Sequence, residues 1–180
     1  MIFYTPSYRG FSLAQLVVVI AIIALLSSVV LANLSEQKKK SRDAQRISDL
    51  QQLQLALRLY KDANGEYPAM GCGTFNGNKW SSPGPGDAVY YSSCDVYITG
   101  LVPDYISVLP RDPSMENNNN VGFLYRSNGT DYKLLTHATA EKGVITKGSP
   151  FARCPASCGD QFTHCSQASY SVYSAGASCW

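Results

Sequence analysis

The sequence predicts an α+β fold in which one long N-terminal α-helix packs on a small antiparallel β-sheet head that has disulfide-bonded loops. Three observations predict it: an uncharged run over residues 11–35, a following stretch with helical hydrophobic spacing, and two β-prone segments around Asn128-Gly129. The helix is therefore expected to have a transmembrane half and an amphipathic half that carries the head.

The run from Phe11 to Ser35 contains no charged side chain. A helix needs about 20 apolar residues to cross a bilayer, so this run is long enough. A cleaved secretory signal is the alternative, but its apolar region spans only ~7–15 residues and ends in a small-x-small site, which is not evident here. The run therefore predicts a retained membrane helix.

The stretch from Ser41 to Tyr60 lacks Gly and Pro and predicts an amphipathic helix. Its apolar residues recur at helical spacing: Ile47, Leu50, Leu53, Leu57 and Tyr60. Leu55 and Leu59 are expected to widen this stripe. Asn64-Gly65 predicts a left-handed C-cap, and Pro68 prevents the helix from resuming.

The head is predicted from a hairpin signal. Asn128-Gly129 is a preferred pair for a type I′ turn, and the flanking residues alternate: Phe123, Tyr125, Tyr132 and Leu134. A third strand is expected around residues 144–146. Residues 71–87 have the composition of a loop, and a disulfide between Cys72 and Cys94 would restrain it.

All six cysteines lie beyond the uncharged run, which indicates disulfides formed in an oxidising compartment. Two bridges of open connectivity are expected among Cys154, Cys158, Cys165 and Cys179. Zinc is the alternative at Cys154, Cys158, His164 and Cys165, but their spacing matches no common zinc template, so disulfides are favoured.

Charge and motifs exclude several functions. The net charge of +2 gives no basis for a nucleic-acid partner. No metalloprotease, nucleophile-elbow or phosphate-loop motif is present, so no catalytic residue and no enzyme activity are predicted. The lysines at 38–40 with Arg42 and Arg46 would place the C-terminal part in the cytoplasm by the positive-inside rule, but the cysteines favour export.

A resemblance to a known family starts at Arg9-Gly10. These residues, Phe11-Ser12-Leu13 and the apolar run resemble the class III signal of type IV pilins and pseudopilins. The resemblance implies that a prepilin peptidase cuts between Gly10 and Phe11, that Phe11 is methylated, and that the helix is retained.

Gln15 departs from the family pattern. It is the fifth residue of the expected mature chain, where the family usually has a Glu that pairs with the N-terminal amine of a neighbouring subunit. Glutamine can accept a hydrogen bond from an ammonium group but cannot neutralise its charge. Gln15 is therefore the candidate assembly residue.

The resemblance covers roughly Arg9 to His137. Over this part the chain resembles the major pseudopilin type and related short pilins. Beyond the signal, the residues that carry the resemblance are Asp43 to Tyr60, Asn64-Gly65-Glu66-Tyr67-Pro68, 101–113 and the 123–134 hairpin.

The resemblance also supplies a segment-by-segment organisation. The expected segments are a leader over 1–10, a transmembrane or filament-core helix over 11–35, a stalk helix over 36–63, a β-sheet head over 64–147 and a Cys-rich tail over 148–180.

The function that the resemblance implies is a structural subunit of a type IV pilus or a type II secretion pseudopilus. The processed subunit would wait in the bacterial inner membrane with its head outside the cytoplasm. An ATPase-driven inner-membrane platform would then assemble it with other pilin or pseudopilin subunits into a helical homopolymer.

Two further hypotheses concern calcium binding and an alternative function. The major pseudopilins of type II secretion bind calcium after a Leu-Pro-x-Asp-Pro-like segment, and Asp112, Glu116 and Asp131 offer oxygen ligands of the type calcium takes. The alternative function is a membrane-anchored, disulfide-rich binding or adhesion domain that does not polymerise, with Tyr170, Tyr173 and Trp180 as contact residues.

Overall fold

The computed structural model describes residues 10, 12–76, 79–84, 91–115, 121–141, 145–146, 148–158 and 168–180. Its contacts divide the chain into two compact units, Met1–Lys38 and Lys39–Trp180. Helix α1, Leu13–Asn64, contributes residues to both units.

In the first unit, α1 carries large apolar side chains that are exposed, among them Leu13 at 81% and Leu25 at 70%. In the described part of the chain, no helix combines the length and the apolarity that crossing a membrane requires.

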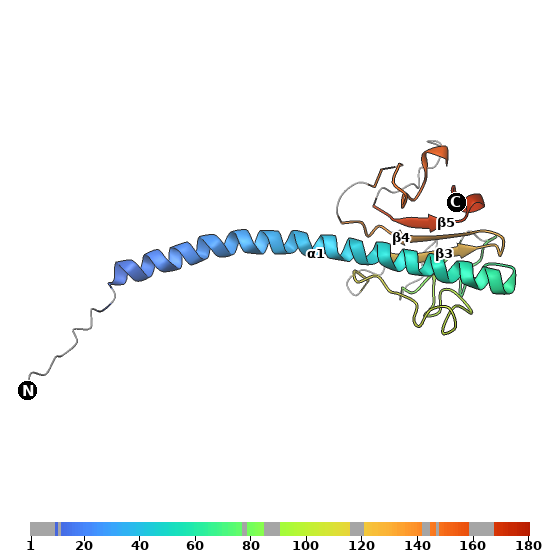
Figure 1. Ribbon diagram of the computed structural model, residues 1–180, viewed down its shortest axis with the longest axis horizontal. Helices are drawn as coiled ribbons and strands as arrows, with labels where there is room; N and C mark the ends of the chain where they lie inside the picture. Colours follow the sequence, from blue (N-terminus) through green and yellow to red (C-terminus); the bar gives the residue numbers. More distant parts are fainter. Residues whose placement is uncertain are drawn as a thin grey trace, which may run out of the picture. The chain divides into compact units, whose positions relative to one another are not determined.

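In the second unit, the predicted stripe of α1 forms one side of the core. Leu50, Leu53 and Leu57 are fully buried and pack against Phe123 of strand β3, Gly122–Ser127, and Leu134 of strand β4, Tyr132–His137. Ile47 and Tyr60 are partly buried at the edges. The C-terminal half of α1 thus lies across β3 and β4 (Figure 1).

The expectation that Leu55 and Leu59 widen this stripe is wrong, because they are 60% and 48% exposed. Each helical residue advances about 100°, so Leu55 lies about 200° from its second neighbours Leu53 and Leu57. It therefore projects from the far side of the helix.

The helix ends as predicted. Gly65 has a φ of 84°, and its N–H donates to the carbonyl of Lys61 at 2.8 Å, which closes the last turn. A residue with a side chain adopts this left-handed conformation at a cost, so glycine suits the position.

The described residues form a five-stranded sheet in the order β2-β1-β3-β4-β5. Its strands are β1 Trp80–Ser82, β2 Tyr91–Ser93, β3 Gly122–Ser127, β4 Tyr132–His137 and β5 Ser171–Tyr173. The prediction of an antiparallel sheet is only partly right, because β1 pairs with β2 in parallel while the other pairs are antiparallel.

The prediction of a third strand around residues 144–146 is also wrong for the described residues. Ile145 and Thr146 lie outside any strand, and Val144 is outside the described residues. The neighbour of β4 is β5, from the C-terminal part of the chain, with Leu134 opposite Val172. β5 has the β-branched Val172 but is only three residues long, too short for a sequence pattern to reveal.

The hairpin between β3 and β4 forms, and its alternating residues Phe123, Tyr125, Tyr132 and Leu134 all face the α1 core. Its turn differs from the expected two-residue type I′ turn. Ser127 pairs with Tyr132, which leaves four residues in the loop, and only Gly129 has positive φ there. The Asn128 side chain accepts hydrogen bonds from the N–H groups of Thr130 and Asp131, so it substitutes for a backbone turn.

The end of the C-terminal part lies against the sheet face opposite α1, where Lys133 donates to Ser178 and Trp180 and where Arg126 lies over the Trp180 ring. This part contains the short 3-10 helices η1, Ala156–Cys158, and η2, Ala175–Ala177, and lies beside β5 in Figure 1. A disulfide joins Cys158 to Cys179, and the expected Cys72–Cys94 bridge is confirmed. Cys154 is also disulfide-bonded, whereas Cys165 is outside the described residues.

The burial pattern of α1 predicts contrasting effects of two leucine substitutions. Leu53→Ala is expected to lower the free energy of unfolding by about 2–5 kcal/mol, because it opens a cavity in the core. Leu55→Ala, the matched control, is expected to change it by less than about 0.5 kcal/mol. Denaturant unfolding of the full chain in detergent measures both, and equal losses would contradict the assigned face.

Candidate functional site

The start of α1 is closed by a pair of reciprocal hydrogen bonds. Gln15 N–H donates to Ser12 Oγ at 3.3 Å, and Ser12 N–H donates to Gln15 Oε1 at 3.0 Å. This is a capping box, in which two otherwise unsatisfied N–H groups gain acceptors. Gly10 is exposed and non-helical, and Phe11 is outside the described residues.

A second polar site joins α1 to the head. Arg46 is fully buried on the apolar side of the helix, four residues before Leu50. Its guanidinium donates to both carboxylate oxygens of Asp112, at 2.7 Å and 3.0 Å, and to Asp43 Oδ1 at 2.8 Å. It also donates to the hydroxyl of Ser114.

Glu141 completes this Arg46 cluster from the segment after β4. Its Oε1 accepts from Arg46 Nη1 at 3.0 Å and from Arg42 Nε at 2.6 Å, and its backbone N–H donates to Asp43. We define the Arg46 cluster by its charged members: Arg42, Asp43, Arg46, Asp112 and Glu141.

Electrostatics within the cluster favour the charged forms. The hydrogen bond from Arg42, together with that from Arg46, lowers the pKa of Glu141 from 4.5 to about 2. Burial opposes the charge on Arg46, but the hydrogen bonds that Arg46 donates to its carboxylate partners outweigh this effect, and the pKa of Arg46 rises. Arg46 and Glu141 therefore stay ionised across the physiological pH range.

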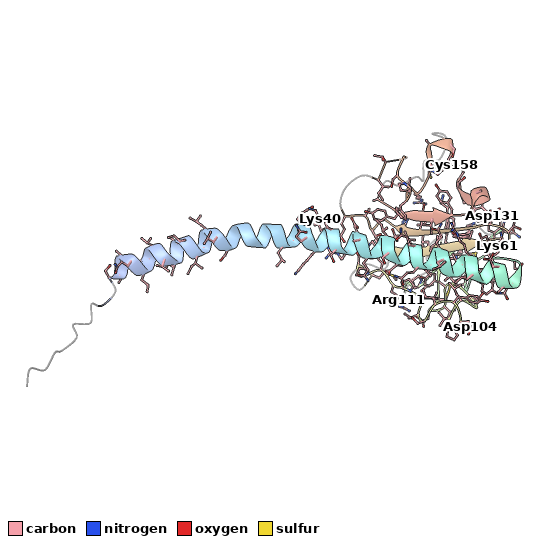
Figure 2. The ribbon with its side chains drawn as sticks, in the orientation of Figure 1. Lys40, Lys61, Asp104, Arg111, Asp131 and Cys158 are labelled. Carbon is pink, nitrogen blue, oxygen red and sulfur yellow. A yellow bond between two sulfur atoms is a disulfide. The ribbon has the colours of Figure 1, made fainter. Side chains whose placement is uncertain are left out.

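The structure separates the calcium candidates. Asp112 is held by Arg46 and also accepts the N–H of Ser114, whereas Asp131 accepts from Ser174 Oγ at 2.6 Å and from the N–H of Gly176. Figure 2 shows Asp131 beside Lys61 near the end of α1, with Arg111, the chain neighbour of Asp112, on the other side of the helix in this view.

The donor groups around Asp112 and Asp131 therefore do not fit a calcium ion shared by these two carboxylates. Among the described residues no group of three or more His, Cys, Asp or Glu side chains is placed to hold a metal. Glu116, the third candidate, lies outside the described residues.

The other predicted residues have internal roles. Cys154 and Cys158 are not available as zinc ligands, because both sulfurs are in disulfides. The other two zinc candidates, His164 and Cys165, lie outside the described residues. Of the aromatic contact residues, Tyr170 is buried, and Trp180 stacks edge-on against Phe75 with ring centroids 5.0 Å apart.

Sequence reasoning missed the two polar sites, although each left a signal. Ser12-x-x-Gln15 before an apolar run is the pattern of a capping box. Arg46 falls on the apolar stripe, and a buried arginine requires acidic partners. Which acids would pair with it was not readable, because Asp112 and Glu141 are far from it in the sequence.

These features define the class of the chain: an α+β protein whose long helix is clamped onto a small sheet, as the resemblance to pilins and pseudopilins implied. Comparison with curated proteins supports the pilin and pseudopilin family over about a third of the chain. No family model matches it, and no solved structure does.

The relatives are proteins named type II secretion system core protein G. The chain is 42% identical over 64 residues to that of Escherichia coli (strain K12), covering 36% of this chain and 44% of the relative. It is 41% identical over 61 residues to that of Pectobacterium carotovorum and 43% identical over 60 residues to that of Klebsiella pneumoniae. The matches span 39% and 43% of those relatives, so less than half of each is covered.

The buried Arg46 cluster predicts that Arg46→Ala destabilises the fold by about 3–5 kcal/mol, because it leaves buried carboxylates without their cation. Thermal or denaturant unfolding of the full chain measures this loss. Arg58→Ala is the matched control, because Arg58 is an exposed arginine of the same helix. Equal effects of the two substitutions would show that the cluster does not hold the helix.

Glu141 predicts how stability depends on acid. Its folded-state pKa of about 2 lies below its ordinary value of 4.5, so the stabilisation is complete above about pH 4.5 and is lost as the pH falls towards 2. Unfolding measured between pH 6 and pH 2 should show a smaller acid loss in Glu141→Gln than in the wild type. Parallel pH profiles for the two proteins would rule this contribution out.

Proposed function

We propose that this chain is a structural, non-enzymatic subunit of a helical filament, assembled with further copies of itself as a type II secretion pseudopilin. The observation that carries the proposal is the 42% identity over 64 residues to the type II secretion system core protein G of Escherichia coli. The α+β head clamped to a long helix is consistent with it.

The choice between the two filament types follows from the same relatives. Those from Escherichia coli, Pectobacterium and Klebsiella are all named as secretion-system core proteins, which favours a pseudopilus over a type IV pilus. A surface pilus would place this chain in fibres sheared from intact cells, and a pseudopilus at normal expression would not.

Processing is proposed between Gly10 and Phe11 by a prepilin peptidase, with methylation of the new N-terminal Phe11. The helix start supports this position, because Gly10 is exposed and non-helical while both members of the capping box, Ser12 and Gln15, lie on the mature side of the cut. Cleavage there would leave the cap of α1 intact.

In this proposal the uncharged segment 11–35 lies first in a membrane and later in a filament core. The subunit would first be held in the bacterial inner membrane with its head outside the cytoplasm. An ATPase-driven platform would then move it into a filament core. The exposed apolar side chains from Leu13 to Leu26 support this, because lipid or neighbouring helices would remove them from water.

The proposed processing is tested by intact-mass and N-terminal analysis of the full chain from its native membrane. The expected protein begins at methylated Phe11. Reductant should add about six hydrogens, because six cysteines in three bridges require them. A chain that still begins at Met1 in cells with a working peptidase would contradict the proposed processing.

Gln15 gives a prediction on assembly. Gln15→Glu should raise incorporation into filaments, because a carboxylate can pair with the N-terminal amine of a neighbour and can still accept the Ser12 N–H. The measurement is the fraction of subunits crosslinked in filaments. Gln52→Glu, which adds the same charge at an exposed site, is the control. An unchanged fraction would show that this charge does not drive recruitment.

A further inference from the structure

The sheet face opposite α1 has an unusual concentration of basic groups. Arg126 of β3 and Lys133 of β4 stand directly opposite each other in the strand register. His137 lies four residues further along β4, and Arg153 comes from the 148–158 segment. In the described part of the chain, no carboxylate forms an ion pair with any of the four.

Two of these basic groups have partners among rings and backbone oxygens. Arg126 lies 4.5 Å from the ring centre of Phe75 and 5.5 Å from that of Trp180. Lys133 is fully buried and donates to the backbone oxygens of Ser178 at 2.7 Å and Trp180 at 2.9 Å. Rings and backbone oxygens thus compensate part of the charge on these two groups.

Arg153 and His137 lack such compensation. Arg153 Nε and His137 Nδ1 are buried atoms without a hydrogen-bond partner. Leaving a buried polar atom of this kind unpaired has a free-energy cost, because the atom has lost its hydrogen bonds to water. An acceptor that reached both nitrogens would remove this cost.

The backbone places Arg153 and His137 on the two sides of Tyr170. Ala152, next to Arg153, forms a β-bridge with Tyr170, and the N–H of Thr136, next to His137, donates to the Tyr170 carbonyl. Burial and the positive charge of Arg153 both lower the pKa of His137, and burial lowers the pKa of Arg153 itself. The two groups therefore share a desolvated, positively charged environment.

We propose that Arg153 and His137 bind a small oxyanion, such as sulfate or phosphate, on the sheet face that the C-terminal part of the chain covers. Arg153 is partly exposed as a residue, although its Nε is buried. Its fork of N–H donors suits an oxyanion, and the His137 ring supplies a further donor. The site is independent of the filament proposal.

The charged and titratable groups around His137 determine how binding depends on pH. Arg153 is the charged group that acts on the His137 ring. Lys133, with Arg126 and Tyr173 opposite it, lies four residues away along β4, and none of these groups is acidic at neutral pH. An anion would favour the imidazolium form, so binding should raise the pKa of His137 and strengthen as the pH falls. A rise of one pKa unit corresponds to about a tenfold stronger affinity for the protonated form.

The test is an NMR titration of His137 in the full chain in detergent, with and without sodium sulfate at matched ionic strength. His164 is the only other histidine, so a His164→Gln background leaves one imidazole signal. Millimolar sulfate is expected to raise the pKa of His137. Thermal stability alone is a poor readout, because sulfate stabilises many proteins by exclusion from their surfaces.

Arg153→Gln provides the decisive variant and Arg111→Gln the matched control, since Arg111 belongs to an exposed ion pair with Asp95. Arg153→Gln should raise the starting pKa of His137 and abolish its response to sulfate, whereas Arg111→Gln should keep the response. No sulfate response in the parent, or an equal response in Arg153→Gln, would overturn the proposal. A response to phosphatidylglycerol in mixed micelles without one to sulfate would overturn the free-ion site and indicate a lipid headgroup.

Discussion

The buried guanidinium of Arg46 is the interaction on which the arrangement of helix and head depends. It joins Asp43 on the helix to Asp112 and Ser114 in the loop before β3 and to Glu141 after β4. A buried ion cluster adds little net stability compared with apolar packing, but it tolerates few alternative arrangements because each unpaired charge is costly. Burial of the apolar stripe drives α1 to pack on the sheet, and the Arg46 cluster determines the position along the helix at which the sheet packs.

The two faces of the sheet use different chemistry. The face under α1 is closed by leucines and aromatic rings, with Leu53, Leu57, Phe123 and Leu134 all fully buried. The opposite face carries Arg126 and Lys133 beside a smaller apolar cluster of Trp80, Leu124 and Leu135, and the Cys158–Cys179 disulfide restrains the C-terminal residues. A disulfide suits a cover that cannot rely on apolar burial alone, because it restricts the unfolded chain instead. The helix-bearing face thus supports the proposed stalk, and the disulfide-tethered face is the one that accommodates polar groups.

Much of this fold could be predicted because its signals are local. The stripe through Leu50, Leu53 and Leu57, the cap at Gly65 and the alternation in the hairpin each depend on residues a few positions apart. The errors have physical causes as well. Leu55 lies outside the core because its angle around the helix excludes it, and β5 is too short to show a period. The partners of Arg46 required knowledge of long-range contacts, so the sequence could indicate a need for acids without naming Asp112 or Glu141.

We infer that the C-terminal half of α1 and the sheet open as one cooperative unit that is held together through Arg46. Native-state hydrogen exchange of the full chain in detergent can compare the backbone amides of Leu50, Leu53 and Leu57 with those of β3 and β4. The opening free energies of the two sets of amides should agree within about 1 kcal/mol. Helix amides that exchange through openings several kcal/mol less costly than those of the sheet would contradict it.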